Sequence, residues 1–334
     1  MSVVKAAIYP IAVFGTGTIG TRHLQIFSGL ESVQTVAIPV RAQRLVSLKT
    51  QGQQAVATLD EAVAAGARAC VIATDTGRHA EDTCAAVTRG LDVLVEKPLA
   101  VTADDARRVV ACAQASQRRL FVACVLRFSE SLNCFRALLP SIGPVHAVRI
   151  ECQSYLPDWR PQRPYQDTYS ARPGEGGVLL DLIHEIDYAG WLFGWPQRVQ
   201  ATLSNTGRLG IAAEDAADLF WEAPMAGMVS IRVDYLSQPS RRMIRADGTQ
   251  GTLEWDGLAG IVTCAARDAV AQVVRCSQSR EQMFFDQAKA FLTACEASAD
   301  ARLATGEDGV KALAVCDAAR SASRRQAMEP VRYL

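Results

Sequence analysis

The chain lacks an excess of either charge and lacks any long apolar run. Its 334 residues carry 35 Lys plus Arg and 35 Asp plus Glu, so the formal net charge is zero, which argues against a dedicated nucleic-acid-binding protein. No apolar stretch approaches the ~20 residues that a membrane-spanning helix needs. Residues 1–10 hold one lysine and a broken apolar stretch, unlike a secretory signal peptide. We therefore expect neither a nucleic-acid nor a membrane partner.

Clustered metal ligands are also missing. The ten cysteines include no Cys-x-x-Cys pair, and only four histidines are present, whereas a structural zinc site needs several such ligands close together. Several cysteines lie inside apolar stretches such as residues 121–126. We interpret them as reduced, small apolar residues of a cytoplasmic protein without a bound metal.

What is present divides the chain into two halves. Up to about residue 125, short apolar runs alternate with helix-like stretches, a pattern typical of a parallel sheet covered on both faces. After about residue 145, strand-like runs follow one another closely and several alternate apolar and polar residues, which predicts an antiparallel sheet. One helix is expected over 177–193, and two more near 280–297 and 306–323. We predict an α/β domain over 1–126 and an α+β domain with an open, largely antiparallel sheet over 127–334, unless the C-terminal helices pack back on the first domain.

A glycine-rich turn opens the first half. Gly15-Thr16-Gly17-Thr18-Ile19-Gly20 follows an apolar run and precedes a helix-like stretch. In this G-x-G-x-x-G spacing, the first glycine permits a tight turn, the second lets a pyrophosphate approach the backbone, and the third lets helix and strand pack closely. The helix N-terminus adds free N–H groups. The turn predicts a dinucleotide site.

The second apolar run informs on the choice of dinucleotide. An NAD site usually has an acidic residue about 20 positions past the glycines, but no Asp or Glu occurs between Glu31 and Asp60. Arg41 and Arg44 occupy this region and are suited to a 2′-phosphate. We therefore favour NADP(H), with NAD(H) as the alternative.

Four motifs together resemble the Gfo/Idh/MocA oxidoreductases, and the resemblance covers nearly the whole chain. They are the glycine turn followed by His23, the segment from Ala73 to His79, the tripeptide Glu96-Lys97-Pro98, and a G-G-x-x-x-D…H-x-x-D pattern over 176–187. Asp75 stands where the family usually has proline, and Asp181 and His184 are three residues apart where many members have four.

The resemblance implies a fold, a cofactor site and an assembly. The fold is a Rossmann domain followed by an open antiparallel sheet, whose outer face joins copies into a homodimer or homotetramer. The Lys97–Pro98 bond is expected to be cis. The cofactor-binding residues that it implies are the glycine turn, Thr74, Asp75, His79, Glu96 and Lys97, in addition to Arg41 and Arg44 inferred above.

The candidate catalytic residues are Lys97, Asp181 and His184. Lys97 follows an apolar strand, and ligands of open α/β sheets bind outside the carboxyl ends of the strands. Its charge would stabilise a developing alkoxide, with Glu96 orienting it. On one helix over 177–193, Asp181 and His184 would be neighbours, so that Asp181 fixes the imidazole while His184 moves the proton. The other interpretation is a solvated helix face.

Further substrate-binding candidates lie in two loops, besides Lys97, Asp181 and His184. Arg127 either holds a hydroxyl or carboxylate of the substrate or closes a salt bridge. The long loop over 155–169 carries Trp159 and Tyr169. It either covers a sugar-like substrate, as long ordered loops often do, or packs its aromatic rings on its own domain.

Taken together, the motifs predict an NAD(P)-dependent oxidoreductase. Hydride would pass between a nicotinamide and a secondary alcohol or ketone of a sugar, cyclitol or sugar derivative. Two alternatives remain open: a glycoside hydrolase or lyase that uses a bound NAD transiently, and a ligand-sensing regulator on the same fold.

Overall fold

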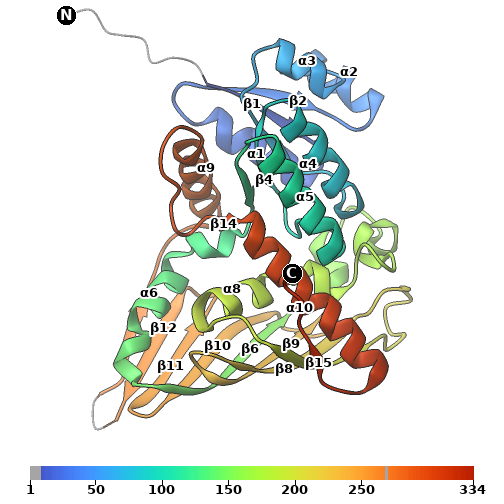
Figure 1. Ribbon diagram of the computed structural model, residues 1–334. Coiled ribbons are helices and arrows are strands. Elements are labelled where there is room, and N and C mark those ends of the chain that lie inside the picture. The colour runs from blue at the N-terminus through green and yellow to red at the C-terminus, as the bar shows by residue number, and fades with distance from the viewer. Residues whose placement is uncertain (1–8, 268–269) are drawn as a thin grey trace, which may run out of the picture. The chain divides into compact units, whose positions relative to one another are not determined.

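Figure 1 shows the computed structural model, which describes residues 9–267 and 270–334. The segment interpreted as unlike a signal peptide, 1–10, therefore lies mostly outside the described residues. The chain divides into two compact units, the first comprising residues up to 100, 104–125 and 280–307, and the second 101–103, 126–279 and 308–334. The domain boundary predicted between 126 and 127 stays a prediction, and residues 280–307 group with the first unit.

The first unit is built on a six-stranded sheet in the order β14-β5-β4-β3-β1-β2. Every strand pair is parallel except β14 with β5. Side chains of β3 and β4 are buried throughout, as the continuous apolar runs predict for strands covered on both faces. The strands are β1 (Tyr9–Phe14), β2 (Val33–Ile38), β3 (Ala69–Ile72), β4 (Asp92–Val95), β5 (Leu120–Val122) and β14 (Ala304–Thr305).

A helix from near the end of the chain completes this unit. Phe291 of α9 is fully buried and meets Phe27 of α1 and Phe121 of β5 edge to face, with ring centroids 6.4 and 6.2 Å apart. Such aromatic pairs add to the area that they bury, so α9 belongs to the core of the parallel-sheet unit. The helices assigned mainly to this unit are α1 (Thr18–Ser28), α2 (Ala42–Thr50), α3 (Leu59–Ala64), α4 (His79–Thr88), α5 (Ala103–Ala115) and α9 (Arg280–Glu296).

The second unit contains a nine-stranded sheet in the order β13-β12-β11-β10-β6-β9-β8-β7-β15. Only the β6–β9 pair is parallel among the described pairs, so the prediction of a largely antiparallel sheet is confirmed. The strands are β6 (Val145–Gln153), β7 (Arg198–Ser204), β8 (Ala216–Ala223), β9 (Gly227–Asp234), β10 (Arg241–Gly248), β11 (Gly251–Asp256), β12 (Ile261–Ala266), β13 (Gln272–Arg275) and β15 (Glu329–Pro330).

The helix predicted over 177–193 is wrong as a single element. It consists of α7 (Val178–Asp181) and α8 (His184–Phe193), separated by Leu182 and Ile183. The backbone leaves helical geometry at Leu182, with φ −100° and ψ 32°. Asp181 and His184 are thus not neighbours on one helix face. The remaining helices of this unit are α6 (Glu130–Leu138) and most of α10 (Gly306–Arg325).

The alternative interpretation of this segment, a solvated helix face, is wrong as well. Glu185 and Tyr188 of α8 are completely buried, because the Arg242 guanidinium of β10 binds the Glu185 carboxylate at 2.9 Å and Tyr188 packs edge to face on Trp255 at 5.8 Å. Helical periodicity placed these polar groups opposite the apolar stripe, but Arg242 and Trp255 of the sheet hold them inside.

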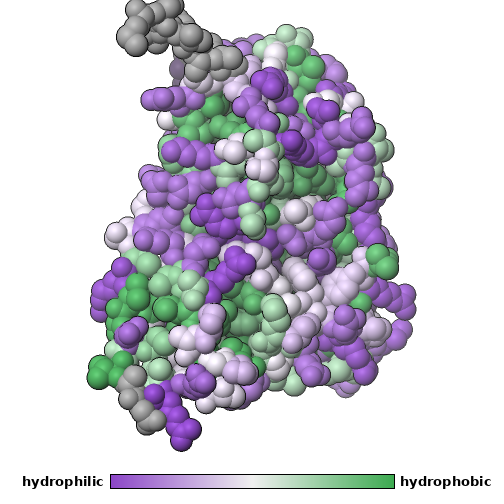
Figure 2. Space-filling view, turned by 60° about the vertical axis from the view of Figure 1, so that its left-hand side comes forward, coloured by the Kyte–Doolittle hydropathy of each residue, from purple (hydrophilic) through white to green (hydrophobic). Residues whose placement is uncertain are grey.

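The face of the molecule drawn in Figure 2 is mixed in character. Figure 2 shows polar side chains spread over the face turned to the viewer, with hydrophobic residues in separate patches between them. Within the described part of the chain, no helix combines the length and the apolar character needed to cross a membrane.

Candidate active site

The glycine turn joins β1 to α1 through three glycines with different surroundings. A Cβ on Gly15 would lie 2.3 Å from the carbonyl oxygen of Ala73, and one on Gly20 only 1.9 Å from that of Gly15. A Cβ on Gly17 would meet nothing within 4 Å. Gly15 and Gly20 are therefore required by close packing, whereas Gly17 borders open space at the N-terminus of α1. These residues fit a dinucleotide pyrophosphate.

The loop after β3 is fixed by side chains of α4. Asp82 accepts hydrogen bonds from the Thr74 hydroxyl at 2.8 Å and from Arg78 at 2.9 and 3.0 Å. His79 is buried, with Nδ1 2.7 Å from the Pro98 carbonyl oxygen and Nε2 3.0 Å from that of Thr74. Burial lowers the pKa of His79. Its ring thus links the loop after β3 to the turn after β4, while Asp75 lies exposed.

The turn after β4 carries Glu96, Lys97 and Pro98. His23 of α1 places Nε2 2.7 Å from Oε1 of buried Glu96, and the Lys97 amide donates to Glu96 Oε2 at 3.3 Å. Burial alone would raise the pKa of Glu96, but the His23 hydrogen bond and the charges of His23 and Lys97 lower it below its usual value. The Lys97–Pro98 peptide bond is cis, as expected. Lys97 is half-buried at the carboxyl end of β4.

The end of β2 has no carboxylate to bind a ribose diol. Arg41 immediately precedes α2 and is exposed, and Arg44 lies in the first turn of that helix, half-buried. Both stay predicted cofactor-binding residues.

In the second unit, Asp181 has a partner that sequence reasoning missed. The hydroxyl of Tyr235 donates a hydrogen bond of 2.6 Å to Asp181 Oδ2, and both residues are buried. Burial, reinforced by the negative charge of Asp181, raises the pKa of Tyr235 well above its usual value. The alternation of the strand over 228–235 puts Tyr235 on the buried face, but no sequence spacing relates it to Asp181, 54 residues earlier. His184, half-buried, begins α8.

The two loop candidates have partners within their own unit. Buried Arg127 donates to Asp187 at 2.6 and 3.0 Å and to Asp308 at 3.0 Å, so the salt-bridge alternative is observed and substrate contact stays a prediction. In the long loop, Trp159 meets Tyr235 edge to face at 5.4 Å, so one of its aromatic rings packs on its own unit. Tyr169 is half-buried with the Arg160 guanidinium 5.8 Å from its ring.

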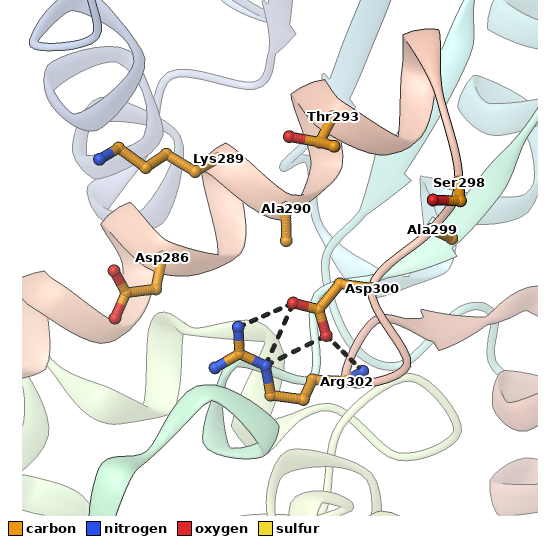
Figure 3. A pocket seen from close by; sticks show the side chains of 8 residues that line it. All are labelled: Asp286, Lys289, Ala290, Thr293, Ser298, Ala299, Asp300 and Arg302. Carbon is orange, nitrogen blue, oxygen red and sulfur yellow. Dashed lines mark hydrogen bonds and ion pairs between the residues drawn. The ribbon is translucent and has the colours of Figure 1, made fainter.

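Figure 3 shows a surface pocket formed by α9 and the segment that follows it. Its charged groups include Asp300, which binds Arg302 at 2.7 Å, and none of the predicted site residues lines it. No group of three or more His, Cys, Asp and Glu side chains suited to a metal ion occurs within residues 9–267 and 270–334.

Two family models match the chain. One, described as an oxidoreductase family with an NAD-binding Rossmann fold, matches residues 10–124. The other, the GFO/IDH/MocA C-terminal domain, matches residues 140–254.

Three relatives illustrate the similarity. An uncharacterized oxidoreductase of Streptococcus pneumoniae is 27% identical over 63% of this chain and 57% of its own length. A 1,5-anhydro-D-fructose reductase of Ensifer adhaerens is 26% identical over 74% of each chain, and an inositol 2-dehydrogenase of Saccharopolyspora erythraea is 31% identical over 62% of this chain and 61% of its own. The match thus spans less than two thirds of some relatives.

A levoglucosan dehydrogenase solved with NADH has the same fold. It superimposes with a TM-score of 0.87 over 98% of this chain and 100% of its own, at 15% sequence identity.

Gly17→Ala is expected to leave folding intact and to weaken NADH or NADPH binding by about tenfold or more, because its Cβ enters only the open space before α1;. Gly20→Ala should instead lower the free energy of unfolding by roughly 1–3 kcal/mol, since its Cβ meets a backbone oxygen;. Dinucleotide titration and urea unfolding of both variants check this. Unchanged binding by Gly17→Ala would contradict the assignment.

Glu96→Gln is expected to lower the free energy of unfolding at pH 7 by roughly 1–3 kcal/mol, through loss of the buried pair with His23;. Because folding lowers the pKa of Glu96, the stability that its charge contributes is present above the unfolded pKa of about 4.3 and is lost as the pH falls through the folded value. Urea unfolding between pH 7 and pH 3 should show the difference between wild type and variant shrinking. Exposed Glu81→Gln is the control, and a difference independent of pH would disprove the account.

Proposed function

Since the chain belongs to the GFO/IDH/MocA family of oxidoreductases, we propose that it transfers a hydride between a nicotinamide dinucleotide and a CH–OH or ketone carbon of a sugar, cyclitol or related compound. The observation that carries the proposal is the open space at Gly17, on the same sheet edge as the turn that holds Lys97. The named activities of the relatives, on 1,5-anhydro-D-fructose and on inositol, support this substrate class.

The first unit supplies cofactor binding and polarisation. The glycine turn binds the pyrophosphate. Thr74 and Asp75 lie in the loop after β3, and His79 begins α4 directly after it, at the same sheet edge. When bound, the nicotinamide accepts or donates the hydride. Lys97 donates a hydrogen bond to the reacting oxygen and stabilises negative charge on it. Glu96 orients Lys97 by fixing the turn between them, because its carboxylate binds both His23 and the Lys97 amide.

The second unit supplies the proton chemistry. His184 takes the proton from the substrate hydroxyl during oxidation and returns it during reduction. Asp181, held by Tyr235, accepts a hydrogen bond from a substrate hydroxyl and supports the imidazolium form of His184 by its charge. Tyr169 and Arg127 are proposed to complete the substrate-binding residues. No contact among the described residues favours either alternative, the hydrolase or lyase that uses a bound NAD transiently or the ligand-sensing regulator.

The nicotinamide cofactor is proposed to be NADP(H). Arg41 and Arg44 at the start of α2, and the missing carboxylate at the end of β2, support binding of a 2′-phosphate. The levoglucosan dehydrogenase with the same fold contains NADH, which keeps NAD(H) as the alternative.

We propose a homodimer or homotetramer formed through the outer face of the nine-stranded sheet. Phe220 of β8 and Met228 of β9 are large apolar side chains about half exposed on these neighbouring strands, as an interface requires. The proposed location is the cytoplasm, supported by ten cysteines that are all free thiols;.

Lys97→Met and His184→Asn are each expected to lower kcat about 100-fold or more with less than about a tenfold change in dinucleotide Kd, because both act on the reacting oxygen. Nicotinamide absorbance would be followed with myo-inositol, levoglucosan and 1,5-anhydro-D-fructose in the direction that each permits. His146→Asn, on an exposed position of β6, is the control. A wild-type protein that turns over none of a broad sugar and polyol panel would sink the proposal.

The double variant Arg41→Ala/Arg44→Ala should weaken NADPH binding about tenfold or more and leave NADH binding within about twofold, because only NADPH carries the 2′-phosphate. Lys49→Ala near the end of the same helix controls for general charge effects. Tighter binding of NADH than of NADPH by the wild type would establish the alternative.

A further inference from the structure

A glutamate outside every predicted motif lies against the turn that carries Asp181. Glu214 precedes β8, and its carboxyl group covers Gly177: a Cβ on that glycine would lie 2.3 Å from Glu214 Oε1 and 2.5 Å from Oε2. Gly177 has φ 89° and directly precedes α7. The carbonyl oxygen of Glu214 accepts a hydrogen bond of 3.0 Å from the amide of Val178. The main chain and the side chain of Glu214 therefore both contact the start of α7.

Asp215, the next residue, contacts the other partner of the Asp181–Tyr235 hydrogen bond. The amide of Tyr235 donates to the carbonyl oxygen of Asp215 at 2.9 Å, and Asp215 is itself completely buried, accepting from the amide and hydroxyl of Thr206. Residues 214 and 215 thus bind the backbone at Val178 and at Tyr235. These two segments supply the carboxylate and the hydroxyl of the 2.6 Å Asp181–Tyr235 bond.

The carboxyl group of Glu214 is in an environment that favours its neutral form. Burial raises the pKa of Glu214, and the charge of Asp181 acts in the same direction, against the amide of Leu179 and the charge of Arg320. Oε1 is buried without a hydrogen-bond partner among the described residues. A buried carboxylate with an unsatisfied oxygen is costly, whereas the neutral acid needs fewer partners. Glutamine therefore resembles the native group more closely than alanine or aspartate does.

We propose that Glu214 is a positioning residue, whose side chain holds the first turn of α7 so that Asp181, at the end of that helix, keeps its hydrogen bond with Tyr235. The inference rests on the proposed function, in which Asp181 touches the substrate. Glu214 acts through Asp181.

The first experiment measures the turn without reference to activity. Hydrogen–deuterium exchange of the peptide covering residues 177–183 is compared in the wild type, Glu214→Gln, Glu214→Ala and the control Glu81→Ala, an exposed glutamate of α4. Glu214→Ala should speed exchange about fivefold or more, because it removes the carboxyl group that packs on Gly177 while the main-chain bond to Val178 remains;. Glu214→Gln and the control should match the wild type. If Glu214→Ala does not fold, Glu214→Asp, one methylene shorter, takes its place.

The second experiment measures kcat and KM with the sugar or polyol of the panel that the wild type turns over fastest. Glu214→Ala should lower kcat about 10- to 100-fold, as expected for a displaced reacting group, with dinucleotide Kd unchanged, and Glu214→Gln should stay within about threefold. Wild-type exchange in Glu214→Ala, equal damage in Glu214→Gln, or faster exchange with unchanged kcat would each overturn the inference. A wild type that is inactive on every panel member defeats the proposed function instead, and the exchange measurement still decides whether Glu214 holds the turn.

Discussion

The first unit depends on a backbone contact that admits no side chain. The turn after β1 approaches the loop after β3 so closely that any Cβ on Gly15 would lie within 2.3 Å of the Ala73 carbonyl oxygen. Gly20 of α1 packs on the same turn, since a Cβ on Gly20 would lie 1.9 Å from the carbonyl oxygen of Gly15. Because these two glycines bring three segments together, Gly17 is left facing open space beside the free amides of the helix start. The proposed phosphate site is thus a result of packing as much as of charge.

Around this contact, buried polar side chains fix the remaining loops to one another. His79 reaches the backbone of both neighbouring loops, and His23 reaches across from α1 to Glu96. A buried polar group is costly unless it is hydrogen-bonded. Each of these histidines therefore favours the one loop conformation in which its ring nitrogens keep their partners. The turn that carries Lys97 is therefore fixed by the hydrogen bonds of both histidines.

Much of this arrangement could be predicted from the sequence, because it follows from local patterns. Apolar runs gave the strands of the parallel sheet, and the spacing of Gly15, Gly17 and Gly20 gave the turn. The pairing of Tyr235 with Asp181 and the burial of Glu185 against Arg242 could not be predicted, since both join segments more than fifty residues apart and neither leaves a periodic trace. The single helix expected over 177–193 failed for a different reason: the side-chain periodicity continues through Leu182 and Ile183, while the helical backbone is interrupted there.

The interruption between α7 and α8 also bears on how such proteins vary. On a continuous helix, one inserted or deleted residue would swing every later side chain by about 100° around the axis. Here the two-residue link separates the aspartate's short helix from the one that begins with the histidine, so a change of length there can be taken up by the link itself. Spacings of three and of four residues between the aspartate and the histidine then fit the same arrangement of two helices and a link.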